Sequence, residues 1–142
     1  MIGFDTTKSL QQLDGEDWGE PNFESHLVLT CQGLRRIPLK DFTVEDMRIM
    51  IGQNIGLDYL IPIALEKIRN NPFSEGAFYP GDLLVSVLRA DSKFWRTHSQ
   101  LRSEVVQIAE RAFTQLSSLS EIEQSSASAA LKEAYDIFER LA

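Results

Sequence analysis

The chain has 142 residues, 43% of them apolar, and a formal net charge of −7 at pH 7. This length suits one domain with a core of its own, and the acidic balance argues against nucleic acid as a direct ligand, because phosphate binding needs clustered lysine and arginine. No apolar run is long enough to span a bilayer, and the single cysteine and the start without a signal-like segment predict a cytoplasmic location.

The first quarter of the chain predicts two helices separated by an acidic segment. Ser9 and Gln12 have the spacing of a capping box for one short helical turn that ends at Gly15. The stretch "LDGEDWGEP", residues 13–21, then places four carboxylates around one tryptophan. Beyond it, apolar residues at helical spacing predict a helix over residues 23–36.

The stretch "DFTVEDMRIMIGQNIGL" carries the clearest helix start. Thr43 is expected as the N-cap, with Asp46 as its capping-box partner. Phe42 and Met47 occupy the two positions of a hydrophobic staple. Gly56 is placed to leave the helix in a left-handed conformation.

Two further helices are expected in the middle of the chain. One covers residues 58–70, with Pro62 near its first turn, where a missing N–H costs least. The stretch "SEGAFYPGDLLVSVL" predicts a loop that leads into the other, with Pro80 near the first helical position. The inward-facing side of this second helix is predicted to consist of Leu83, Leu84, Val87 and Leu88.

The remaining pattern predicts a short helix over 92–98, a long one over 100–116 and a last one over 122–141. No segment alternates with a period of two, so the fold class is all-α: a single compact domain over 1–142 with about six to eight helices and no substantial sheet. Residues 1–8 and the C-terminal helix region 117–142 are the parts expected to be least firmly held.

No residue pattern in the chain predicts catalysis, a metal or a cofactor. His26 and Cys31 are five residues apart, which separates them by about 140° on a helix, and His26 with His98 matches no zinc signature. The acidic segment lacks the twelve-residue calcium pattern, and no phosphate-binding loop is present. We therefore expect a binding protein rather than an enzyme, with no catalytic, cofactor or metal site.

Three stretches together resemble a family of bacterial immunity proteins from contact-dependent growth inhibition (CDI) systems. They are "LDGEDWGEP", "PLKDFTVEDMRIMIGQNIGLDYLIPIALE" and "NPFSEGAFYPGDLLVSVL", and the resemblance covers roughly residues 10–95. It implies a protein that binds and blocks the C-terminal toxin domain, often a nuclease, of an effector delivered by neighbouring cells. The partner expected is a basic toxin domain bound one-to-one by a monomer, without direct contact to nucleic acid or membrane.

The acidic segment has a structural and a functional interpretation, which are compatible. In the first, Trp18 and Pro21 fix the segment against the helical core, and Asp14 or Asp17 accepts local backbone N–H bonds. In the second, carboxylates form an anionic toxin-binding rim. The candidate toxin-binding residues are Asp14, Glu16, Asp17, Glu20, Glu24, Glu75 and Asp82.

Two alternatives to toxin binding stay open at this point. One is a helical adaptor or regulator that binds an endogenous protein, with no toxin; a gene without a toxin-encoding neighbour would favour it. The other is an enzyme with an unrecognised site, in which a single polar-to-alanine change would abolish activity without weakening any complex.

Overall fold

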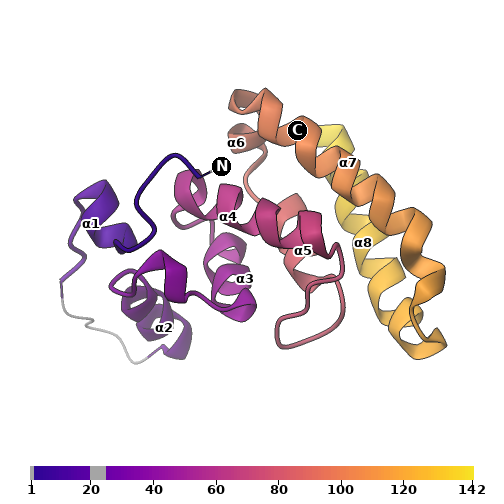
Figure 1. Ribbon diagram of the computed structural model, residues 1–142, viewed down its shortest axis with the longest axis horizontal. Coiled ribbons are helices and arrows are strands. Elements are labelled where there is room, and N and C mark those ends of the chain that lie inside the picture. Colours follow the sequence, from indigo (N-terminus) through magenta and orange to yellow (C-terminus); the bar gives the residue numbers. More distant parts are fainter. Residues whose placement is uncertain (1, 20–24) are drawn as a thin grey trace.

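The computed structural model describes residues 2–19 and 25–142, and within these ranges all regular secondary structure is helical (Figure 1). This confirms the prediction of an all-α fold for the described part of the chain. The elements in order are α1 (Leu10–Asp14), α2 (His26–Leu34), η1 (Leu39–Asp41), α3 (Val44–Gly52), α4 (Leu57–Asn70), α5 (Asp82–Leu88), α6 (Ser92–Thr97), α7 (Ser99–Gln115), η2 (Leu116–Ser118) and α8 (Glu121–Leu141).

The short helix α5 lies at the centre of the core. Six of its seven residues are buried, and only Ser86 is partly exposed. A helix that is apolar on nearly every side must be covered on every side. Helices α3 and α4 pack against it from one direction and α8 packs against it from another, so α5 joins the two halves of the molecule (Figure 1).

Helices α7 and α8 form a long hairpin that η2 closes (Figure 1). Leu131 and Ala134 of α8 are buried, and the Phe138 ring packs edge-on against Trp95 of α6, with the ring centroids 5.6 Å apart. Ser120 and Glu123 form a capping box at the start of α8. None of the described helices is long and apolar enough to cross a membrane.

The segment before α1 runs beside η1. The backbone N–H groups of Leu39 and Lys40 donate to the carbonyl oxygens of Lys8 and Thr6, at 3.0 and 2.9 Å. Phe4 also packs edge-on against a tyrosine ring of α4. The organisation of the chain as one domain, with its ends least firmly held, stays a prediction.

The capping signals in the sequence predicted the starts of α1 and α3 correctly. The predicted capping boxes at Ser9 and Thr43 are both confirmed: the Thr43 N–H donates to Asp46 at 3.0 Å, and the Asp46 N–H donates back to Thr43 at 3.1 Å. Some of the other predicted bounds shift. The helix predicted over 23–36 ends at Leu34, with Arg35 as the C-cap, because the backbone tightens there: the Arg36 N–H donates to the Gly33 carbonyl at 3.1 Å. The predicted start at residue 23 lies outside the described residues.

Two prolines sit differently from the prediction. Helix α4 begins earlier than expected, so Pro62 lies in its second turn, where the missing N–H leaves the Asp58 carbonyl without its helical donor. Pro80 precedes α5 rather than opening it, because Gly81 has a φ of 89° and acts as the N-cap. A left-handed residue at that point prevents the helix from reaching back to Pro80.

Gly56 is left-handed as predicted, with a φ of 65°, but it starts α4 instead of ending α3. Helix α3 already ends at Gly52. A Cβ at position 56 would lie 2.8 Å from a methyl carbon of Leu10, which is fully buried. The backbone conformation and this close approach therefore both require glycine here.

We predict that Gly56→Ala lowers the free energy of unfolding by about 1–3 kcal/mol, because it combines a strained backbone with a clash against Leu10. Gly52→Ala is the matched control: a Cβ there meets nothing within 4 Å, and alanine favours the helix. Urea unfolding followed by circular dichroism measures both. Equal stability of the two variants would contradict this account of Gly56.

Candidate partner-binding surface

Residues 13–19, the described part of the acidic segment, are folded around one buried arginine. Arg35, directly after α2, is 2% exposed. Its Nη2 donates to the Asp14 carboxylate and to the Glu16 carbonyl oxygen, both at 2.8 Å. The Trp18 ring lies over the guanidinium, with the ring centroid 4.6 Å from Cζ. The Arg35 guanidinium therefore holds the segment through hydrogen bonds, and the Trp18 ring packs over that guanidinium.

This arrangement refines the structural interpretation of the segment. Trp18 remains 44% exposed, so it is not inserted into the core, and Pro21 lies outside the described residues. The expected local bonds are confirmed: Asp14 accepts from the Glu16 N–H at 2.9 Å, and Asp17 accepts from the Gly19 N–H at 2.8 Å. The carboxylates thus stabilise the turn that displays the tryptophan.

The candidate residues of this segment divide into two groups. Asp14 forms an ion pair with Arg35, so its charge is already paired within the protein. The hydrogen bond from Arg35 holds the pKa of the Asp14 carboxyl below its usual value. Glu16 and Asp17 are exposed and present their charge to solvent. Glu20 and Glu24 lie outside the described residues and stay predictions. Asp14 is thus better described as a positioning residue.

Asp82 also has a positioning role. It is 2% exposed, and its two carboxylate oxygens accept from the N–H groups of Gly76 at 2.7 Å and Phe78 at 3.0 Å. Glu45 of α3 accepts from the intervening Ala77 N–H at 2.8 Å. Two carboxylates therefore fix three consecutive amides of the loop, and Asp82 is too deeply buried to belong to an exposed rim.

This fixed loop presents one aromatic side chain and one carboxylate. Phe78 is 67% exposed, and the Arg48 guanidinium lies 4.5 Å from its ring centroid. Glu75 is exposed on the same loop. Glu45 pairs with Arg48, whose hydrogen bond lowers the pKa of the Glu45 carboxyl. A rigid loop with an exposed aromatic ring is suited to contact a protein.

The acidic segment also borders a groove that sequence patterns did not indicate. Four carboxylates line this 460 Å³ groove, together with Lys93 and His98. The carboxylates are Asp14, Glu16, Asp58 and Asp91. They come from three separate parts of the chain, since Asp14 and Glu16 both belong to the acidic segment, so no local pattern could join all four. We call this feature the acidic groove.

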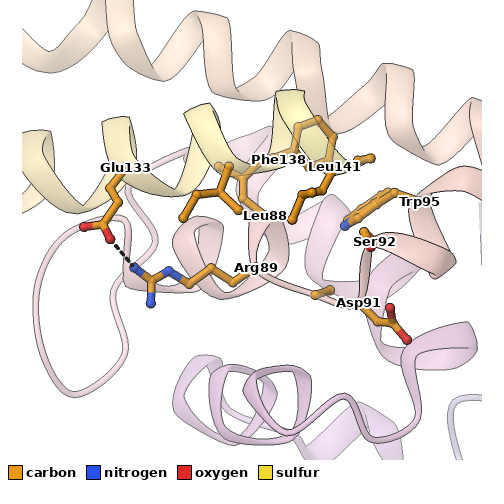
Figure 2. A pocket seen from close by; sticks show the side chains of 11 residues that line it. Leu88, Arg89, Asp91, Ser92, Trp95, Glu133, Phe138 and Leu141 are labelled. Carbon is orange, nitrogen blue, oxygen red and sulfur yellow. Dashed lines mark ion pairs between the residues drawn. The ribbon is translucent and has the colours of Figure 1, made fainter.

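Asp91 also borders a second hollow, which we call the apolar pocket (Figure 2). Its volume is 370 Å³, and it lies between the end of α5, α6 and the end of α8. Leu88, Phe138 and Leu141 form much of its wall, and Arg89 faces Glu133 across its rim at 3.8 Å (Figure 2). The apolar pocket and the acidic groove thus meet at one residue.

Other chemistry has little support among the described residues. Cys31 is buried, and burial raises the pKa of its thiol, which disfavours the reactive thiolate. His26 is exposed on the same helix, about 140° away from Cys31 around the helix axis. Within the two described ranges, no group of three histidine, cysteine or acidic side chains is arranged to hold a metal ion.

We predict that Asp14→Asn lowers the free energy of unfolding by about 1–2 kcal/mol at pH 7, since it weakens the bond to buried Arg35. Because Arg35 lowers the pKa of Asp14, this stabilisation is complete above the unfolded pKa of about 4 and is lost as pH falls through the folded value. The difference from the wild type should therefore shrink in acid. Glu16→Gln, at an exposed position, serves as the control, and a pH-independent difference for Asp14→Asn would contradict the ion-pair account.

Comparison with known proteins identifies the chain. A family model described as CDI immunity proteins matches residues 12–105, about two thirds of the chain. The match includes the acidic segment, the fixed loop and all of α5, and it reaches into α7. No curated protein sequence and no solved structure matches significantly. The chain belongs to the CDI immunity protein family.

Proposed function

We propose that this immunity protein binds and neutralises the C-terminal toxin domain of a cognate CDI effector, in the cytoplasm, as a monomer in a one-to-one complex. The match to the CDI immunity family over residues 12–105 carries the proposal. It implies inhibition by binding, without turnover and without a cofactor. The toxin domain that suits this surface is a nuclease with a basic face, because such a face attracts an anionic inhibitor as it attracts nucleic acid.

The charge of the protein supports a steering role. The net charge is −7, and the acidic groove holds four carboxylates, of which Asp14 is paired with Arg35, beside one lysine and one histidine. Complementary charge raises association toward about 10⁸–10⁹ M⁻¹s⁻¹ at low salt, which favours capture of a toxin before it cuts. Exposed Glu16, Asp17 and Glu75 are the described residues that we assign to the rim, with Glu20 and Glu24 as further candidates.

Growth protection tests the proposal directly. We predict that cells producing the active toxin domain encoded immediately upstream of this gene survive when they also produce this protein, because the complex blocks the toxin. Colony counts after induction of the toxin measure survival, with an unrelated acidic protein as the control. If the cells die as readily as that control, the toxin assignment fails and the helical adaptor becomes the better hypothesis.

We further predict that the triple variant Glu16→Gln, Asp17→Asn and Glu75→Gln associates with the toxin domain about three- to tenfold more slowly at low salt, since rim charges act on the encounter. The effect should fade at high salt, where charges are screened, and dissociation should change little. Stopped-flow measurement with a catalytically inactivated toxin domain gives both rates.

The matched control changes the same number of charges on α7 and α8. Glu110→Gln, Glu121→Gln and Glu139→Gln remove three exposed carboxylates and give the same net charge as the rim variant. If the two triple variants slow association equally, the charge of the whole protein steers the toxin, and the assignment of these rim residues is wrong.

A further inference from the structure

The apolar pocket contains a buried hydrogen-bond donor for which the described residues provide no acceptor. Trp95 is 1% exposed, and its Nε1 has no hydrogen-bond partner in the described part of the chain. Figure 2 shows this nitrogen on the edge of the ring that faces the other lining residues. A buried N–H without an acceptor is destabilising, so this position favours a ligand that brings an acceptor.

The rest of the pocket selects for an apolar group. Leu141 is 56% exposed at its mouth, whereas Leu88 and Phe138 are each 2% exposed in its wall. A large exposed leucine beside a hollow of 370 Å³ is apolar surface that a partner can cover. This volume lies at the small end of the range for ligand sites, which suits one side chain and its backbone better than a larger molecule.

The side of the pocket that adjoins the acidic groove favours positive charge. Asp91 lines both the pocket and the acidic groove, and Glu133 stands at the opposite rim, paired loosely with Arg89. A group that enters the pocket from a basic partner would therefore place its neighbouring cations against the carboxylates of the groove. Apolar centre and charged border are the arrangement found at strong protein contacts.

We propose that the apolar pocket receives an aliphatic side chain from a segment of the cognate toxin domain, next to a lysine or arginine of that segment. The side chain packs on Leu88, Phe138 and Leu141, and a backbone carbonyl of the segment accepts from Trp95 Nε1–H. The neighbouring cation lies against Asp91. This inference rests on the proposed toxin-binding function and adds where the complex is anchored.

Two matched variants on α8 test the anchor. Leu141→Arg places a long cation at the pocket mouth, whereas Ile122→Arg makes the same change at a residue that is 81% exposed in the first turn of the same helix. With the catalytically inactivated toxin domain encoded upstream, calorimetry should show binding weakened about tenfold or more for Leu141→Arg and unchanged within about twofold for Ile122→Arg. Both positions are exposed, and thermal unfolding checks that both variants fold.

The hydrogen bond has a separate test. Trp95→Phe should weaken binding by about two- to tenfold, the value of one such bond. Since this change also removes volume from the core, a second readout uses Trp18→Phe, which leaves Trp95 as the only tryptophan. Its fluorescence emission should shift when the toxin domain is added, because the buried indole N–H gains an acceptor.

Each outcome decides a different claim. Weak binding by Leu141→Arg alone, together with a Trp95 emission change, supports the anchor. Equal affinities of the wild type and both α8 variants, with unchanged emission, overturn the anchor and leave toxin binding standing. If Trp95→Phe binds the toxin domain as tightly as the wild type does, the proposed hydrogen bond from Trp95 Nε1–H does not contribute to the complex. Absence of binding by the folded wild type overturns the proposed function and the anchor together.

Discussion

The burial of α5 is the constraint on which the rest of the structure depends. This helix is too short to be stable alone and is apolar on nearly every side, so it exists only because α3, α4 and α8 cover it. The same requirement brings the C-terminal hairpin into contact with the N-terminal helices. The polar residue at the start of α5, Asp82, is buried with the rest of the helix. A buried carboxylate needs hydrogen-bond donors, and two backbone N–H groups donate to it.

Both ends of α5 lead to surfaces suited to a partner. At its N-terminal end, Asp82 holds the loop that presents Phe78 and Glu75. At its C-terminal end, the chain passes through Leu88 and Asp91 and forms the junction of the apolar pocket with the acidic groove. One buried helix thus positions rigid elements of the candidate surface, and such rigidity lowers the entropy cost of binding.

Local structure was predictable from the sequence, and much of the surface was not. The capping boxes at Ser9 and Thr43 need only residues three apart, so sequence spacing identifies them. The roles of Asp14 and Asp82 depend on burial and on partners distant in the sequence, and local patterns carry no such information. Arg35 carries no local signal of its role, yet its buried guanidinium holds Asp14 of the acidic segment. The acidic groove joins residues from three parts of the chain, which only the packing of the helices brings together.

The measurement that tests the central claim most directly is a calorimetric titration of this protein with the catalytically inactivated toxin domain, repeated at several temperatures and at low and high salt. The account predicts one-to-one binding that weakens with salt, because the acidic groove contributes, and a negative heat-capacity change, because apolar surface is buried at the pocket. No heat of binding between two demonstrably folded proteins, at any salt concentration or temperature, would contradict it.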